Sequence, residues 1–295
     1  MAGRPPWMEK PHPVTTVAKV AVLAASVIVM LYPFVQIVMV SLSDASRYTP
    51  GDLLLAPVGF TTKAYQLVLN GDVVPRALLV SIGVTVAGTL LSMVMTVTLA
   101  YALTQTKRVP GSRVVLLIVL FSMLFTAGII PNYLLVRQLG LIDTYWALLL
   151  PGTISAFNLL VVRNFFMNIP DELLDAARID GAGELGILWR IVLPLSKSVL
   201  AVIALFYGVG YWNAFFGAML YLNDPRMWPV QLVLRQYVLQ ADPIPGTVIE
   251  NTQQVVTPHT LQMAVLVLAT VPILIVYPFL QRYFTKGVLT GAIKG

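Results

Sequence analysis

The chain contains no cysteine and little charge. Among its 295 residues there are two histidines, and charged residues make up 11%. Without cysteine the protein has no disulfide framework and no thiol nucleophile. His12 and His259 are isolated, and no Cys, His or carboxylate cluster has metal-ligand spacing, so we expect no metal site and no catalytic residues. The phosphate-binding pattern G-x-x-x-x-G-K-[ST] is also missing, so we expect no nucleotide cofactor on this chain.

Charge is scarce because the chain is mostly apolar. Hydrophobic residues make up 58% of it and its mean hydropathy is +0.82, which excludes an ordinary soluble domain. A helix needs about 20 apolar residues to cross a bilayer, and the apolar windows lack the alternation of barrel strands. We therefore predict an all-α integral membrane protein, a single domain over 1–295, with six transmembrane helices at 18–43, 77–106, 114–136, 143–162, 198–223 and 260–281.

The basic residues predict the orientation. Six spans place both termini on one side, and thirteen of the nineteen Lys and Arg residues lie on that side. Cytoplasmic segments carry the excess of Lys and Arg, so both termini are predicted to be cytoplasmic, in a multi-pass protein of the bacterial inner membrane. The outer loops are then 44–76 and 224–259. The net charge of +6 follows from this topology and does not indicate a nucleic-acid partner.

Residues 163–197 form a charged segment between two apolar windows. Five of the thirteen carboxylates lie there. Pro170 followed by two acidic residues predicts a helix start, and Gly181 predicts its end. A second short helix is expected from Glu184 to Val192, ending before Pro194. The segment is either a knob that docks on a soluble partner or an amphipathic helix that lies on the membrane or on the chain's own surface.

A motif within this segment distinguishes the two interpretations. The run 175–182 reads DAARIDGA and is followed by IVLP at 191–194. It resembles the EAA loop of ABC-importer permeases, with Asp175 in place of the family's leading Glu. The resemblance implies a type I importer permease fold and a loop that docks on an ATPase subunit. The residues it assigns to this coupling are Asp175, Ala176, Ala177, Asp180, Gly181, Ala182, Leu193 and Pro194.

The resemblance extends over most of the chain. It is greatest to carbohydrate-importer permeases related to the second membrane subunit of the maltose transporter. Within these, residues 125–150 resemble the branch that serves oligosaccharides and polysaccharide fragments, of which an alginate-oligosaccharide importer is a member. The resemblance implies ATP-driven uptake of an oligosaccharide. The implied partners are a homologous second permease, two ATPase subunits that bind ATP and Mg, an extracytoplasmic solute-binding protein and membrane lipid.

The C-terminal tail, 282–295, also matches this family. In maltose-type permeases such a tail reaches between the two ATPase subunits. Three glycines and few charges favour an extended segment, in which Gly287, Gly291 and Lys294 would contact the ATPases. The alternative is a frayed chain end.

Four polar or aromatic residues in the fourth and fifth windows are candidates for the substrate pathway. They are Asn158, Tyr211, Trp212 and Asn213. Polar groups at membrane depth pair with one another or line a wet cavity, and aromatic faces can stack on sugar rings. Helix packing, with Asn213 hydrogen-bonded to a neighbouring helix, is the favoured alternative.

Two other classes of membrane protein compete with the permease interpretation. A secondary transporter or channel for a small solute would carry ion-coupling charges inside its spans, and the centres of these windows have none. An integral membrane enzyme would need reactive side chains near one face, where this chain has the docking motif instead.

Overall fold

The computed structural model describes residues 13–292, apart from 48, 50, 107 and 241–255. Within these ranges every regular element is helical and none is a strand, as the sequence predicted. The chain divides into two compact units, Met1–Asn70 with Thr247–Val267 and Gly71–Gly246 with Leu268–Gly295. Each unit is described by itself.

The first unit contains α1 (Pro13–Ser41), α2 (Lys63–Asn70) and the beginning of α14 (Pro258–Ala292). Most apolar side chains of α1 are exposed, as suits a helix that faces lipid. Gln36 fastens the following loop to this helix. Its side-chain amide donates to the carbonyl oxygen of Asp52 (2.6 Å), and its side-chain oxygen accepts from the backbone N–H of Leu54 (2.8 Å).

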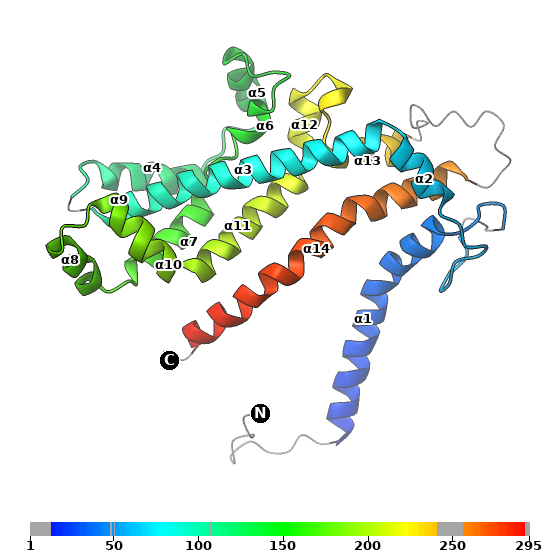
Figure 1. Ribbon diagram of the computed structural model, residues 1–295, viewed down its shortest axis with the longest axis horizontal. Helices are drawn as coiled ribbons and strands as arrows, with labels where there is room; N and C mark the ends of the chain where they lie inside the picture. The colour runs from blue at the N-terminus through cyan, green and yellow to red at the C-terminus, as the bar shows by residue number, and fades with distance from the viewer. Residues whose placement is uncertain (1–12, 48, 50, 107, 241–255, 293–295) are drawn as a thin grey trace. The chain divides into compact units, whose positions relative to one another are not determined.

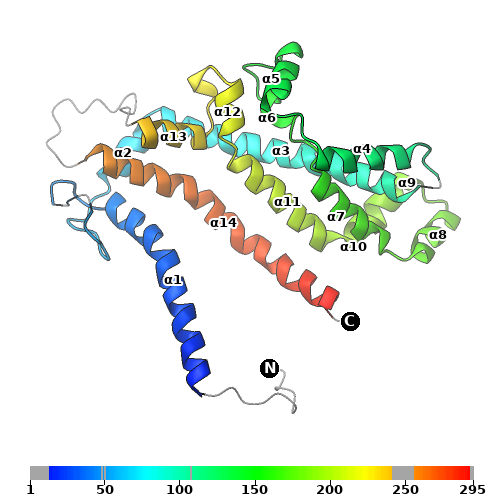
Figure 2. The ribbon, with the colours of Figure 1, turned by 180° about the vertical axis from the view of Figure 1, so that it is seen from behind.

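The second unit is built on α3 (Val73–Thr104), which packs along α7 (Ala156–Met167) and α11 (Lys197–Trp212), as Figures 1 and 2 show. Small residues line the buried face of α3, and they let helices approach closely. At Gly88 the fit is tight, because a Cβ there would lie 2.7 Å from ring carbons of Tyr211. The sequence of α3 therefore determines how near α11 can come.

Three predicted windows are not continuous helices. Window 114–136 contains α4 (Ser112–Leu124) and α5 (Ile129–Gln138), and window 143–162 contains α6 (Trp146–Leu149) and α7. Window 198–223 contains α11 and α12 (Phe216–Tyr221). The expectation of unbroken helices is therefore wrong there. Gly128 adopts a φ of 84° and interrupts window 114–136. Pro151 lies between α6 and α7 in window 143–162.

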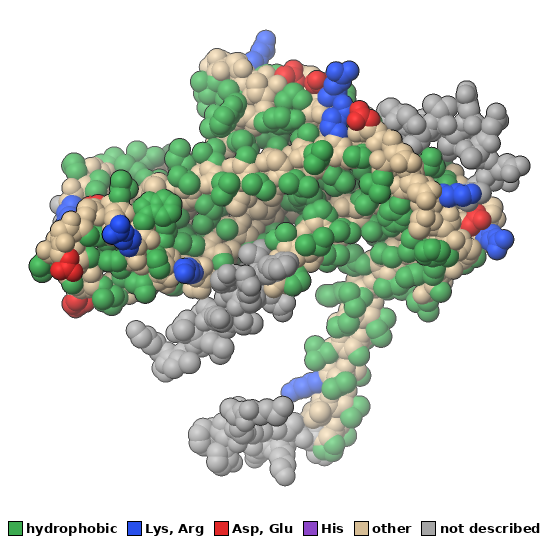
Figure 3. Space-filling model, in the orientation of Figure 1, with side chains coloured by type: hydrophobic (Ala, Val, Ile, Leu, Met, Phe, Trp, Pro, Cys, Tyr) green, Lys and Arg blue, Asp and Glu red, His purple; other side chains and the backbone are tan. Residues whose placement is uncertain are grey.

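Hydropathy identifies the membrane-crossing elements. Of the described helices, three are long and apolar enough to cross: Pro13–Ser41, Val73–Thr104 and Pro258–Pro278. A further pair, Glu184–Leu195 and Lys197–Trp212, is bent by 87°, so the two halves do not run in one direction. Figure 3 shows the apolar side chains that cover the helices. An integral membrane protein is confirmed, while the count of six spans and the side of the termini stay predictions.

The outer and C-terminal segments complete the second unit. In the predicted outer loop, η2 (Pro225–Met227) precedes α13 (Val230–Gln240), which packs on α3. Residues 241–255 of that loop lie outside the described residues. Helix α14 continues to Ala292, so the extended conformation expected for the tail is wrong. Gly287 and Gly291 lower helix propensity by about 1 kcal/mol each relative to Ala, but an isolated glycine does not end a helix.

Candidate functional site

The first helix of the charged segment, α8 (Asp171–Ile179), begins and ends where the sequence predicted. Pro170 precedes it, and Asp171 and Glu172 complement the positive end of the helix dipole. Gly181 has a φ of 81°, and its N–H donates to the carbonyl of Arg178 (3.0 Å). The N–H of Ala182 donates to the carbonyl of Ala177 (2.9 Å). This hydrogen-bond pair is a Schellman motif, which requires the left-handed conformation that glycine favours.

The second helix differs from its prediction. It begins at Glu184 as α9 (Glu184–Ile187), widens into a π-helix, η1 (Leu188–Val192), and continues as α10 (Leu193–Leu195). The expected stop before Pro194 is therefore wrong. A proline lacks the N–H and collides with the carbonyl four residues earlier in an α-helix, and the wider π turn shifts the hydrogen-bond register just before it. We call the whole segment Asp171–Leu195 the knob.

Buried aliphatic side chains hold the knob against the helices. Leu174 of α8 is 5% exposed, and Ile187, Leu188 and Val192 are 3% exposed or less. They share one apolar cluster with Val97, Ala100, Tyr101 and Leu103 of α3 and with Leu159, Val162 and Phe166 of α7. Each such side chain stabilises the packed state by about 1.5–3 kcal/mol. The knob is therefore part of the second unit's core.

The outer side of the knob leaves large apolar side chains uncovered. Ile179 is 87% exposed, Leu185 71% and Trp189 67%. The exposed acidic residues Asp171 and Asp180 lie on the same segment, and Figure 3 shows charged side chains at the end that carries α8 and α9. Exposed apolar side chains beside charged ones are typical of a protein interaction site, and Ile179 and Leu185 meet this description. Trp189 borders a hollow with Leu193, Pro194 and the start of α11.

A network of ion pairs links the two halves of the knob. Arg178 donates from Nη1 to Asp175 Oδ1 (2.8 Å) and from Nε to Glu184 Oε1 (3.1 Å). Arg108, from the α3–α4 connection, also donates to Glu184 Oε1 (3.1 Å), and the Tyr101 hydroxyl donates to Glu184 Oε2. Burial raises the pKa of Glu184. A larger, opposite effect comes from the hydrogen bonds of Tyr101 and Arg178 and from the positive charges of Arg178 and Arg108. The net shift of the Glu184 pKa is therefore downward.

This shift predicts an acid-sensitive knob. A lowered pKa in the folded state contributes stability above the ordinary glutamate pKa of about 4.3, and that stability is lost as the pH falls through the lowered value. We expect amide protection in α8, measured by hydrogen exchange, to decrease as the pH drops below about 4. Glu184→Gln should start with lower protection and lose less of it on acidification. Glu172→Gln serves as the control, and an identical acid response in both variants would contradict the assignment to Glu184.

The structure places all eight predicted coupling residues on the knob. Ala177, Ala182 and Leu193 are half-buried, and the other five are exposed: Asp175, Ala176, Asp180, Gly181 and Pro194. Their contact with an ATPase subunit stays a prediction. Sequence reasoning missed Tyr101, Gln105 and Arg108, and it assigned Glu184 only to a helix start. The contacts of Glu184 with Tyr101 and Arg108 join residues 83 and 76 positions apart, and no local pattern marks such pairs.

The tail residues give no geometry for a site. Gly287 and Gly291 lie in α14, and Lys294 lies outside the described residues. A contact of this tail with ATPase subunits stays a prediction.

The structure gives the predicted pathway residues contacts inside the protein. The Tyr211 hydroxyl donates to the carbonyl of Leu149 (3.2 Å) and pairs with the Ser92 hydroxyl (3.0 Å). Asn213 donates to the carbonyl of Val209 in its own helix (3.0 Å), not to a neighbouring helix as the packing alternative expected. Asn158 and Trp212 are 6% and 5% exposed. These contacts favour packing for Tyr211.

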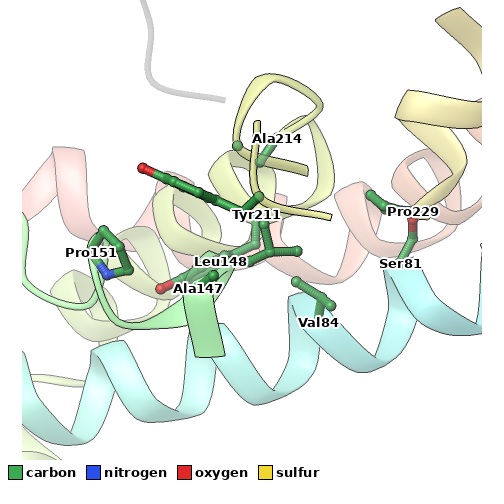
Figure 4. Close-up of a pocket in the computed structure, with 10 residues that line it drawn as sticks. Ser81, Val84, Ala147, Leu148, Pro151, Tyr211, Ala214 and Pro229 are labelled. Carbon is green, nitrogen blue, oxygen red and sulfur yellow. The ribbon is translucent and has the colours of Figure 1, made fainter. Parts of the chain in front are cut away.

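A cavity of about 150 Å³ adjoins Tyr211. Val84 of α3, Leu148 of α6 and Tyr211 of α11 line it, as Figure 4 shows. The lining is mostly apolar, and the Ser81 hydroxyl that borders it already accepts a hydrogen bond from the N–H of Val230 (2.8 Å). A sugar needs several hydrogen-bond partners, so this cavity by itself is a poor saccharide site.

Tyr211→Phe separates packing from substrate contact. Loss of the hydroxyl removes the Ser92 partner (3.0 Å) and one of two donors to the Leu149 carbonyl, which keeps the Thr153 hydroxyl (2.8 Å). This should destabilise the protein by about 1 kcal/mol. We expect a lower midpoint of thermal unfolding in detergent and unchanged transport affinity. Tyr133→Phe, which keeps a ring stacked against Tyr221, serves as the control. A weakened affinity with unchanged unfolding would instead assign Tyr211 to the substrate.

Comparison with known proteins agrees with this geometry. Residues 19–290 match the family described as "Binding-protein-dependent transport system inner membrane component". The chain is 46% identical over 268 residues to Protein LplC of Bacillus subtilis (strain 168), which covers 90% of each chain. It is 43% identical over 269 residues to the polygalacturonan/rhamnogalacturonan transport system permease protein YtcP of the same organism, covering 91% of this chain and 94% of that protein.

A solved structure extends the likeness to the fold. A chain in the crystal structure of a bacterial ABC transporter involved in the import of the acidic polysaccharide alginate superposes with a TM-score of 0.89. The two are 32% identical, and the match covers 95% of this chain and 99% of that chain. This confirms the type I permease fold expected from the motif at 175–182. The chain therefore belongs to the family of inner membrane components of binding-protein-dependent transport systems.

Proposed function

We propose that this chain is one of two membrane subunits of an ATP-driven importer for oligosaccharides. It pairs with a homologous permease in the bacterial cytoplasmic membrane and receives substrate from an extracytoplasmic solute-binding protein. Two ATPase subunits bind ATP and Mg and perform the hydrolysis, while this chain binds no cofactor. The family match and its likeness to sugar-importer permeases support this assignment.

The knob is the observation that carries the proposal. It combines a buried apolar base with three large apolar side chains that are left uncovered, Ile179, Leu185 and Trp189. A helix pair that is packed firmly on one side and presents apolar side chains on the other can fit a groove on a soluble partner. In the proposed mechanism, ATP binding closes the two ATPase subunits, and the knob carries their movement into the membrane helices. The pathway between the two permeases then opens outward, and hydrolysis resets it.

The substrate we propose is an oligosaccharide fragment of an acidic polysaccharide. The relative YtcP is named for polygalacturonan and rhamnogalacturonan, and the similar solved structure is of an alginate importer. Galacturonate and alginate units both carry a carboxylate. The sugar's identity depends equally on the partner permease and the binding protein, so the experiment uses the assembled transporter.

Purification of the tagged chain from its native membrane tests this function. We expect a second permease and an ATPase to co-purify, and the binding protein with oligogalacturonate or oligoalginate to stimulate hydrolysis. A neutral maltooligosaccharide of the same length is the control and should not stimulate. Stimulation by the neutral sugar alone would overturn the acidic substrate. A lone chain that transports in vesicles without ATP would overturn the importer and favour a secondary transporter.

A further inference from the structure

The knob has polar contacts with a second segment that the coupling motif does not include. This segment is the C-terminal end of α3 and the α3–α4 connection, with Tyr101, Gln105 and Arg108. The Arg178 guanidinium donates from Nη2 to Gln105 Oε1 (3.3 Å), and Arg108 and Tyr101 both donate to Glu184. A longer contact joins Arg108 and Asp175 (4.0 Å). Among the described residues, each of these polar contacts involves Asp175, Arg178 or Glu184 on the side of the knob.

Arg178 occupies the centre of this arrangement. Its fork contacts three different elements at once: Asp175 on α8, Glu184 on α9 and Gln105 just after α3. Its side chain is only 18% exposed. A lysine has a single ammonium group and cannot reproduce this planar geometry. The position therefore requires arginine for its shape as well as its charge.

Isolated ion pairs on the surface contribute little to stability. The strength of this arrangement therefore depends on whether the partners of Glu184 are buried. Tyr101 is 8% exposed and belongs to the apolar cluster beneath the knob. A buried hydroxyl without an acceptor is costly, and the Glu184 carboxylate is the acceptor here. Glu184 thus connects the buried wall of α3 with two arginines nearer the surface. A network that shares one carboxylate in this way stabilises the structure more than the same number of separate exposed ion pairs.

We propose that Arg178 and Glu184 are positioning residues that clamp the knob to the α3–α4 connection. The clamp makes the knob and the end of α3 move together. Because α3 packs along α7 and α11, a displacement applied to the tip of the knob is carried into the centre of the second unit. This consequence for transport rests on the proposed function, but the clamp itself is a property of the isolated chain.

Hydrogen exchange on the purified chain tests the clamp directly. The N–H groups of Arg108 and Val109 both donate to the Gln105 carbonyl (2.9 Å each), and that of Ala182 donates to Ala177. These amides report on the two sides of the clamp. In Arg178→Lys and Glu184→Gln we expect exchange at both sides to accelerate together, by about tenfold for the lysine variant. Arg113→Lys, a change at an exposed arginine of α4, should leave both sides unchanged.

A second variant separates the clamp from a local role of Arg178 in α8. Asp175→Asn removes the charge of the i,i+3 partner on α8 and weakens the longer contact with Arg108 (4.0 Å), but it leaves Glu184 and Gln105 in place. It should accelerate exchange at Ala182 more than at Arg108 and Val109. If Arg178→Lys and Glu184→Gln also leave Arg108 and Val109 unchanged, the clamp is refuted.

The assembled transporter then tests the consequence. We expect Glu184→Gln to co-purify with the ATPase as the wild type does, but to transport fewer molecules for each ATP hydrolysed. An unchanged ratio, with exchange altered as predicted, would refute the role of the clamp in coupling. Failure of the wild-type chain to recover any ATPase would refute the proposed function, and the exchange result would still decide the clamp.

Discussion

Gly181→Val is expected to lower oligosaccharide uptake at least tenfold in cells that accumulate normal amounts of the protein in the membrane. Gly181 has a φ of 81°, and no atom lies within 4 Å of the position of a Cβ. The Cβ of valine would therefore meet no steric clash, and the cost of this residue comes from the left-handed backbone conformation. A β-branched residue in the left-handed region costs about 1–3 kcal/mol. We expect the backbone of the variant to leave the left-handed conformation. The Schellman hydrogen bonds are then lost, and the angle between α8 and α9 changes.

The matched control is Gly183→Ala. Gly183 precedes α9 with a φ of −71°, and a Cβ there also meets open space. Alanine adopts this conformation without strain, so uptake should stay close to wild type. Uptake and the amount of protein in the membrane are measured together for both variants. Normal uptake by Gly181→Val at normal expression would refute the knob as the coupling element.

The second large effect is expected from Ile179→Asp, which should reduce the ATPase that co-purifies with the chain by more than tenfold. Ile179 is 87% exposed, so its replacement leaves the core intact. In the proposed complex its side chain is covered by the ATPase, and burying it contributes about 1.5–3 kcal/mol. An aspartate at the same place loses that contribution and adds the cost of a buried charge without a partner.

Leu53→Asp is the control for this change. Leu53 is 79% exposed and lies in 44–76, the loop predicted to face outward. The substitution introduces the same charge on a similarly exposed aliphatic residue, and it should leave recovery of the ATPase unchanged. Equal loss in both variants would indicate a general defect in assembly. Equal recovery in both would show that Ile179 is not part of the docking surface.

Several features of the fold follow from local sequence. The apolar windows at 18–43 and 77–106 largely overlap α1 and α3, and the window at 260–281 lies within α14. Segments that cross lipid must be long apolar helices with internal backbone hydrogen bonds. The ends of α8 follow from Pro170 and Gly181 for conformational reasons that act within a few residues. The coupling residues were predicted from two short runs, 175–182 and 191–194, and motifs of this kind are visible in one sequence.

Hydropathy averages across a window and does not detect a break inside it. The break between α6 and α7 leaves backbone groups without helical partners, and distant side chains supply them. Tyr207 accepts a hydrogen bond from the N–H of Ser155 (3.0 Å). Tyr211 donates to the carbonyl of Leu149 (3.2 Å), which also accepts from the nearby Thr153 hydroxyl (2.8 Å). These tyrosines are 52 and 62 positions away, so the sequence near the break does not reveal why it is tolerated.

By itself, the sequence determined the helical membrane class, three of the long helices, the two ends of α8 and the motif that marks the knob. Each depends on hydropathy or on conformational preferences of neighbouring residues. Only the tertiary structure decided where the helices break, how α9 passes into a π-helix before Pro194, and which residues Arg178 and Glu184 contact. The breaks and the π-helix are built around single Gly and Pro residues whose effect depends on the packed surroundings. The contacts of Arg178 and Glu184 join residues distant in the chain, and they form only when the knob is packed on the end of α3.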